Sequence, residues 1–174
     1  MSELQGAVAL AQLSKVKDIV ARRRRGAELL TSLLEGTPLV ACPYIPPGTK
    51  HSYWLYFLNV TEPEDGQLTQ QFGDALVAEG IPAWVRYIID PLYMSPIFAQ
   101  PATYGSSGYP FSSYGVQTFG RGLCRQAENA LNRAIAIHWN ENLTDSHVRS
   151  IAEAVTSVAN HFHAQRPRPA VLNA

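Results

Sequence analysis

The sequence contains three lysines, whose side-chain amines could form a Schiff base with a carbonyl compound. Such a lysine normally lies in a buried pocket, where desolvation lowers its pKa and makes it nucleophilic. Lys15 and Lys17 fall in a charged stretch of a predicted helix, and Lys50 ends a connector rich in proline and glycine. None of the three has the setting of a catalytic lysine, so we expect no Schiff base on this chain.

Other patterns of catalytic residues are equally weak. No Gly-x-Ser-x-Gly elbow occurs, and the five histidines have no serine or cysteine partner marked in the sequence. His161 and His163 have no cysteine or carboxylate at ligand spacing, so we expect no metal site. The Gly-Ser-Ser-Gly stretch at 105–108 lacks the spacing of a phosphate-binding loop and is typical of a turn. The residues alone therefore predict no catalytic residue.

Charge is concentrated in four consecutive arginines, Arg22–Arg25. They fan over about 300° of a helix, which favours a solvated helix surface over a nucleic-acid patch. Fourteen basic and fourteen acidic residues cancel, and no stretch approaches the roughly 20 apolar residues of a membrane span. Cys42 and Cys124 indicate free thiols, and no secretory leader pattern opens the sequence. We expect a soluble, cytoplasmic protein that binds neither nucleic acid nor membrane.

One long helix is predicted over residues 1–36. Ser2 and Gln5 form a capping-box pattern, apolar residues recur at helical spacing, and Gly36 ends the helix. An internal glycine, Gly26, costs a helix only about 1 kcal/mol. Small residues in the first turns favour the close approach of another element: Gly6, Ala7, Ala9 and Ala11.

Strands and helices alternate in the rest of the sequence. We expect them in order at residues 51–60, 68–79, 83–88, 126–133, 134–138 and 144–162. Three strands separated by helices predict an α/β (α+β) fold, in which a small, mostly antiparallel three-stranded sheet packs with helices.

The first strand, 51–60, is expected to lie at the centre of the sheet with both faces covered. Period-two alternation predicts one face with Trp54, Tyr56 and Leu58 and the other largely with Leu55, Phe57 and Val60. The last helix should cover this strand through four apolar residues: Ile151, Val155, Val158 and Phe162.

The segment 89–122 is rich in proline, glycine, serine and tyrosine and is too long for an ordinary connection. Such a loop is either functional or anchored to something else. We expect both this loop and the opening helix to expose apolar side chains and to mediate self-association.

Three stretches resemble the DegT/DnrJ/StrS-type sugar aminotransferases. Met1–Leu13, followed by Arg22–Arg24 and Ala27, resembles the helix that leads from the large to the small domain of that family. Tyr104–Phe111 is similar to a loop found in a subset of the family, and His138–Thr144 resembles a strand-to-helix junction near its C-terminus. The order and separation of the three stretches fit from residue 1 to about residue 163.

The resemblance implies a fold-type-I enzyme of the aspartate aminotransferase superfamily, a homodimer that uses pyridoxal phosphate (PLP). Such an enzyme moves an amino group from glutamate or glutamine to a keto sugar or cyclitol. The resemblance divides the chain into a connecting helix at 1–36, a small C-terminal domain at 37–163 and a flexible tail at 164–174. The family's Schiff-base lysine and cofactor-binding residues lie upstream of the matching segment. We therefore expect a truncated member, inactive alone and without PLP of its own.

By analogy with the family, five residues are candidates for binding a nucleotide-sugar or cyclitol substrate: His51, Arg86, Tyr87, Tyr93 and Tyr104. Aromatic packing within the sheet and loop explains the histidine and the tyrosines equally well. Arg86 is either a bidentate donor to a nucleotide phosphate or an ordinary surface residue. An alternative function is a non-catalytic binding or dimerisation module, whose partner would be a second copy or the missing large domain.

Overall fold

The computed structural model describes residues 1–61, 66–100, 103–115 and 119–166. Its first helix, α1 (Glu3–Leu13), begins at the predicted capping box. The Ser2 hydroxyl accepts from the amide of Gln5, and the Gln5 side chain accepts from the amide of Ser2 at 2.8 Å. These bonds satisfy two of the amides that a helix N-terminus leaves unpaired.

The single helix predicted over 1–36 is wrong, because the chain breaks between α1 and α2 (Val16–Leu33). The hydroxyl of Ser14 donates to the carbonyl oxygen of Ala11 at 2.9 Å. A serine that bonds to the backbone in this way competes with the helical hydrogen-bond ladder. No residue of α1 is buried, so no packing opposes the break.

Four strands form one antiparallel sheet in the order β1-β2-β4-β3. They are β1 (Val40–Ala41), β2 (Leu55–Val60), β3 (Ala83–Val85) and β4 (Ala134–His138). The predicted α/β class with a mostly antiparallel sheet is confirmed, with one more strand than expected. The predicted first strand, now β2, is central, paired with β1 on one side and β4 on the other.

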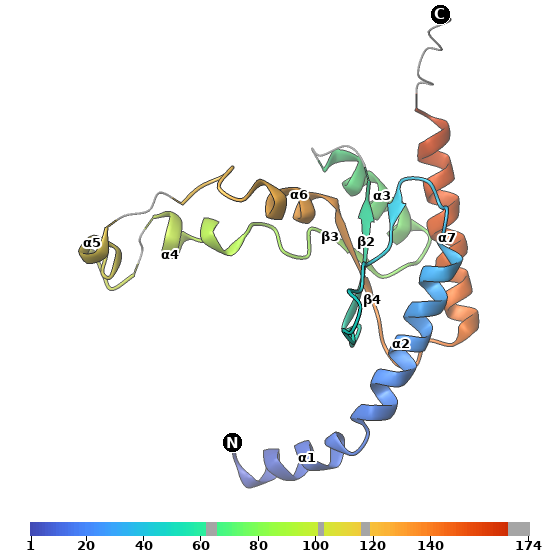
Figure 1. Ribbon diagram of the computed structural model, residues 1–174, viewed down its shortest axis with the longest axis horizontal. Helices are drawn as coiled ribbons and strands as arrows, with labels where there is room; N and C mark the ends of the chain where they lie inside the picture. Colours follow the sequence, from blue (N-terminus) through green and yellow to red (C-terminus); the bar gives the residue numbers. More distant parts are fainter. Residues whose placement is uncertain (62–65, 101–102, 116–118, 167–174) are drawn as a thin grey trace, which may run out of the picture.

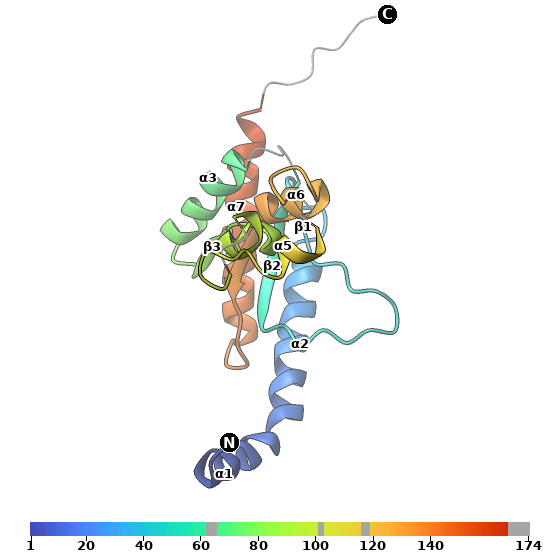
Figure 2. The same cartoon turned by 90° about the vertical axis from the view of Figure 1, so that its left-hand side faces the viewer.

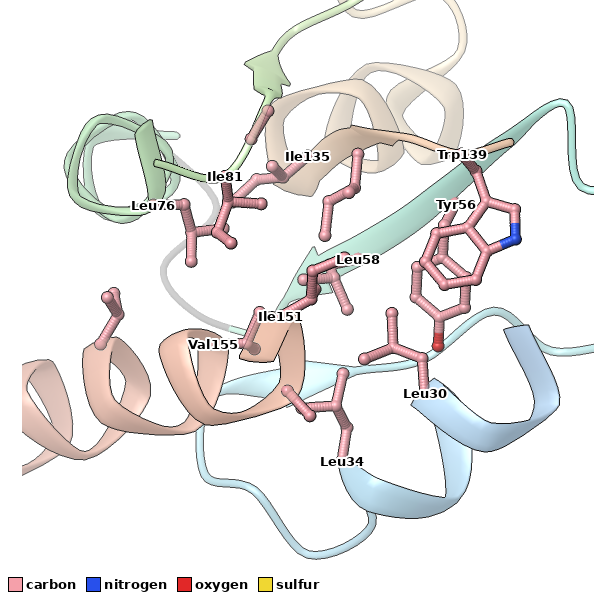
Figure 3. Packing of buried hydrophobic residues seen from close by; sticks show 14 of the residues in the cluster. Leu30, Leu34, Tyr56, Leu58, Leu76, Ile81, Ile135, Trp139, Ile151 and Val155 are labelled. Carbon is pink, nitrogen blue, oxygen red and sulfur yellow. The ribbon is translucent and has the colours of Figure 1, made fainter. Parts of the chain in front are cut away.

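The core lies between the sheet and three helices, α2, α3 (Gln67–Ala78) and α7 (Asp145–Ala164) (Figures 1 and 3). Helix α7 covers the sheet through Ile151, Val155 and Val158, with Phe162 at the margin, as predicted. Gly73 of α3 lies so close to β3 that an added Cβ would meet Val85 Cγ2 at 2.0 Å. Helix α6 (Arg125–Arg133) leads directly into β4.

The predicted faces of β2 are partly wrong. Val60 is buried in the core beside Tyr56 and Leu58, because residues two apart along a strand share a face. Trp54 is 66% exposed instead of buried with them. It precedes the first residue of the strand, and the left-handed backbone of Tyr53 (φ 50°) interrupts the alternation there.

Between β3 and α6 the chain runs out from the body and returns (Figures 1 and 2). We call the segment 87–124 the arm. Its described residues include a 3-10 helix, η1 (Leu92–Met94), and the short α-helices α4 (Pro96–Ala99) and α5 (Phe111–Tyr114). None of the described residues of the arm is buried. This confirms the expectation of exposed apolar surface in the long loop.

Helix α1 and the arm project from the same side of the body, α1 from its lower end and the arm at the height of the sheet (Figures 1 and 2). As expected, the large apolar side chains of α1 are more than half exposed: Leu4, Val8, Leu10 and Leu13. The predicted close approach of another element is not found, because within the described residues no residue of α1 is buried. The predicted tail begins at 164, where α7 ends, and its last part, 167–174, lies outside the described residues.

Candidate functional site

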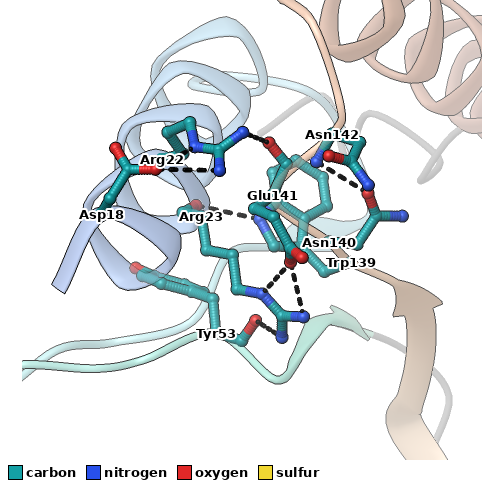
Figure 4. Close-up of polar contacts among 8 residues, drawn as sticks. All are labelled: Asp18, Arg22, Arg23, Tyr53, Trp139, Asn140, Glu141 and Asn142. Atoms are coloured by element: carbon teal, nitrogen blue, oxygen red, sulfur yellow. Dashed lines mark hydrogen bonds and ion pairs between the residues drawn. The ribbon is translucent and has the colours of Figure 1, made fainter. Parts of the chain in front are cut away.

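Two of the stretches that carry the family resemblance contact each other (Figure 4). Helix α2 supplies Arg23, and the junction between β4 and α7 supplies Trp139 and Glu141. The Arg23 guanidinium donates to the Glu141 carboxylate at 2.9 Å, and the Trp139 indole N–H donates to the Arg23 carbonyl oxygen at 2.9 Å. The Trp139 ring is buried against Gly26, where an added Cβ would lie 3.1 Å from it.

This junction is an electrostatic lock between α2 and the β4–α7 connection. The pKa of Glu141 lies below its usual range, because its carboxylate accepts hydrogen bonds from the backbone amide of Glu141 itself and from the Arg23 guanidinium. Arg23 also donates to the carbonyl oxygen of Tyr53 at 3.5 Å. The bonds therefore join α2 to the segment just before β2 and to the segment just after β4, and they stabilise the fold.

Each of the four consecutive arginines faces an acidic side chain. Arg22 pairs with Asp18 at 2.9 Å and Arg23 with Glu141 at 2.8 Å, while Arg24 and Arg25 have more distant partners. The predicted solvated helix surface fits Arg25, whose side chain is 69% exposed. It does not fit Arg23, whose side chain is only 21% exposed.

His51 lies beside a cavity of about 420 Å³ between α2 and the connector that follows β1. Its Nδ1 accepts from the amide of Tyr53 at 2.9 Å, and the two rings lie 4.4 Å apart. The cavity wall mixes charge and hydroxyl groups, including Arg24, Glu28 and Thr31.

Arg86 and Tyr87 lie where the chain leaves β3 for the arm. Arg86 has a left-handed backbone (φ 52°), and its guanidinium donates to the carbonyl oxygen of Ile89 at 3.0 Å. Its Nε is buried and has no hydrogen-bond partner. The ring of Tyr87 meets the exposed Trp54 edge-on at 6.1 Å.

Tyr93 lies at the root of the arm, and its hydroxyl is engaged within the chain. It donates to Glu128 Oε1 of α6 at 2.5 Å and accepts from the amide of Cys124 at 3.3 Å. Desolvation, then the hydrogen bond to Glu128, raises the pKa of Tyr93.

Tyr104 lies in the outer part of the arm and is 75% exposed. It lines a cavity of about 400 Å³ whose other walls are mostly apolar: Ile97, Phe98, Thr103, Pro110 and Phe111. Beside this cavity the rings of Phe98, Phe111 and Phe119 pack on one another with centroids 5.7 to 6.3 Å apart.

The structure brings Arg86, Tyr87 and Tyr93 to the root of the arm, whereas His51 and Tyr104 lie apart from them. Sequence reasoning missed Glu128, because nothing in a short helix marks the residue that faces a tyrosine 35 positions earlier. It also missed Glu141, although that residue stands inside a stretch recognised by resemblance.

The residues that the structure describes do not have the arrangement of a PLP site. Such a site needs a buried lysine that forms the Schiff base and a charged partner for the pyridine nitrogen. Lys15, Lys17 and Lys50 are all exposed. Lys17 and Lys50 line the same shallow cavity, whose remaining walls contain Arg24 and three apolar residues but no carboxylate.

A model of the DegT/DnrJ/EryC1/StrS aminotransferase family matches residues 1–156, and the chain belongs to this family. It is 25% identical over 168 residues to dTDP-4-dehydro-2,3,6-trideoxy-D-glucose 4-aminotransferase of Saccharopolyspora spinosa, a match that covers 95% of this chain and 36% of that protein. The chain spans about a third of the length of the curated relatives it matches.

Solved structures of sugar aminotransferases share the fold. DesV of S. venezuelae, determined with a ketimine intermediate, matches 96% of this chain and 38% of its own, with 20% identity and a TM-score of 0.73. Spr1654 of Streptococcus pneumoniae, determined in its PLP form, matches 92% of this chain and 36% of its own, with 18% identity and a TM-score of 0.66. Among the described residues, no helix is long and apolar enough to span a membrane.

Proposed function

We propose that this chain is the small domain of a PLP-dependent sugar aminotransferase and that it does not catalyse amino transfer by itself. The observation that carries the proposal is the family match over residues 1–156, confined to about a third of each relative. The three exposed lysines support the second half of the proposal. The lysine that holds PLP would then come from a large domain, in the same polypeptide or another chain.

In that assembly the parent reaction is the transfer of an amino group from glutamate or glutamine to a keto sugar or cyclitol. The relative from Saccharopolyspora spinosa is named for a dTDP-linked keto sugar, which supports a nucleotide-sugar substrate. We propose that His51, Arg86, Tyr87 and Tyr104 contribute to the substrate site from the small domain. Tyr93 would contribute by holding the arm at its root. The two free thiols, Cys42 and Cys124, support a cytoplasmic location.

The experiment incubates this chain with PLP, treats it with borohydride and measures the mass of each lysine-containing peptide. We expect no lysine to carry the reduced cofactor. A chimera then joins Met1 of this chain to the preceding segment of the Saccharopolyspora spinosa relative, and we expect it to bind PLP and react with glutamate. The same chimera with its cofactor lysine replaced is the control.

Specific trapping of PLP on Lys15, Lys17 or Lys50 of the isolated chain would contradict the proposal. So would a folded chimera that binds PLP through the relative's lysine but whose cofactor absorbance does not change with glutamate.

A second candidate function, a dimerisation module, is favoured by α1. Its Leu4, Val8 and Leu10 are all more than half exposed, and they do not form one stripe. A helix with apolar side chains on more than one face needs a partner to cover them. Sedimentation at tens of micromolar concentration measures whether the partner is a second copy of the chain.

A further inference from the structure

The arm has few means of holding its position. None of its described residues is buried, so no hydrophobic core fixes it. The ring cluster of Phe98, Phe111 and Phe119 packs the outer part of the arm on itself, not on the body. Whatever orients the arm must therefore act at its root, where the outgoing segment at 90–93 passes the returning segment at 121–124.

Glu128 is the residue where these two segments meet. It lies in the first turn of α6, which continues without interruption into the central strand β4. Its Oε1 accepts from the hydroxyl of Tyr93 at 2.5 Å and from the amide of Gly122 at 2.7 Å. One carboxylate oxygen thus holds the outgoing and the returning segments of the arm together.

The hydroxyl of Tyr93 completes a closed set of bonds. It accepts from the amide of Cys124 at 3.3 Å while it donates to Glu128. Hydrogen bonds to an ionised carboxylate are shorter and roughly twice as strong as neutral ones. The other link at the root, Arg121 with Asp90 at 3.3 Å, joins side chains 62% and 44% exposed. Exposed ion pairs of that kind contribute little.

We propose that Glu128 is a positioning residue that holds the arm on α6 through Tyr93 and Gly122. We call the hydrogen bonds that join Glu128, Tyr93 and Gly122 the clamp. This inference does not depend on the proposed function, because every atom of the clamp belongs to this chain. It assigns Tyr93 a structural role at the root of the arm, where the family resemblance made this residue a candidate for contact with substrate.

The test measures amide hydrogen exchange of the whole chain, comparing arm peptides within 87–124 with peptides of β4 and α7. We expect Glu128→Ala and Tyr93→Phe to speed exchange in the arm at least tenfold and to leave the body unchanged. Glu128→Gln should restore most of the protection, because its amide oxygen accepts the same two hydrogen bonds. Asp90→Asn, which removes only the exposed ion pair, is the matched control and should change exchange less than twofold.

Unchanged exchange in the arm of both Glu128→Ala and Tyr93→Phe would overturn the proposal. An Asp90→Asn variant that releases the arm as fully as Glu128→Ala would do the same. If Glu128→Ala does not fold, Tyr93→Phe still decides the question, because it keeps the ring and removes only the hydroxyl that bonds to Glu128.

Discussion

Single residues decide where this fold departs from simple periodicity. Tyr53 takes a left-handed backbone (φ 50°) and is nevertheless buried, with its carbonyl oxygen facing Arg23. Non-glycine residues seldom adopt that conformation, and no sequence pattern marks a tyrosine that does. For that reason period-two alternation wrongly places Trp54 with the core residues, whereas it is correct for Tyr56 and Leu58 inside the regular strand.

Ionisable residues at the root of the arm give a pH dependence. The hydrogen bonds from Tyr93 and from the amide of Gly122, together with Arg121, hold the pKa of Glu128 below its ordinary value of 4.5. A lowered pKa means that the clamp is fully stabilising above 4.5 and is lost as the pH falls through the lower value. We expect the NMR amide shift of Gly122 to be constant at neutral pH and to titrate with a midpoint below 4.5.

The control for this titration is Glu128→Gln, in which the Gly122 amide should keep its environment and show no midpoint in the same pH range. A midpoint at or above 4.5 in the parent chain would mean that Glu128 is not held in its ionised form.

At the scale of elements, the approach of α3 to β3 depends on one missing methyl group. Alanine normally stabilises a helix interior by about 1 kcal/mol over glycine. At Gly73, however, the added Cβ would lie 2.0 Å from Val85 Cγ2. Overpacking of this kind typically costs about 1–3 kcal/mol, so the clash exceeds the gain in helix propensity. We expect Gly73→Ala to lower the free energy of unfolding measured in urea.

A second variant separates the clash from other effects. Val85→Ala removes the methyl group that Gly73→Ala would meet, so the double variant should recover part of the loss through a favourable coupling energy. If the two single effects simply added, the close packing of α3 on β3 would not be the cause.

Most helices and strands of the body could be predicted from the sequence, because β2 is rich in aromatic and β-branched residues and α7 has an amphipathic pattern behind a capping residue, Thr144. Two features could not be predicted. The two-residue β1 is too short to show any period. The break between α1 and α2 depends on Ser14 bonding to the backbone where no packing holds the helix straight, which periodicity does not report.

The candidate site was less predictable than the fold. Its residues were assigned by family resemblance, and in this chain they are spread from the His51 cavity to the outer arm. The contacts that organise the root of the arm join residues 93, 122 and 128, and only the tertiary structure brings them together.

At the scale of the whole molecule, α1 and the arm project from one side of the body and leave apolar side chains uncovered (Figure 1). Self-association of the chain would cover them. We expect the parent chain to associate at tens of micromolar concentration, because Val8 and Leu13 are 54% and 65% exposed on a helix that nothing else covers within the described residues. The double change Val8→Glu and Leu13→Lys adds charges that a paired apolar surface would have to desolvate. Sedimentation velocity should show a shift to monomer.

The matched control for this pair is Gln12→Glu, which adds a charge to the same helix without altering an apolar position. A parent chain that is monomeric at these concentrations and binds no hydrophobic dye would contradict the expectation for α1.

The lock between Arg23 and Glu141 has a consequence for how the chain folds during synthesis. Its two halves are separated by 118 positions, and both β2 and β3 pair with β4, which comes late in the chain, just before α7. At a synthesis rate of about 5–20 residues per second, α2 is complete several seconds before α7, one of its main packing partners, exists. During that interval the apolar side chains of α2 that later enter the core are open to chaperones and to other nascent chains. Packing of the core is therefore a late event, because it must await the synthesis of β4 and α7.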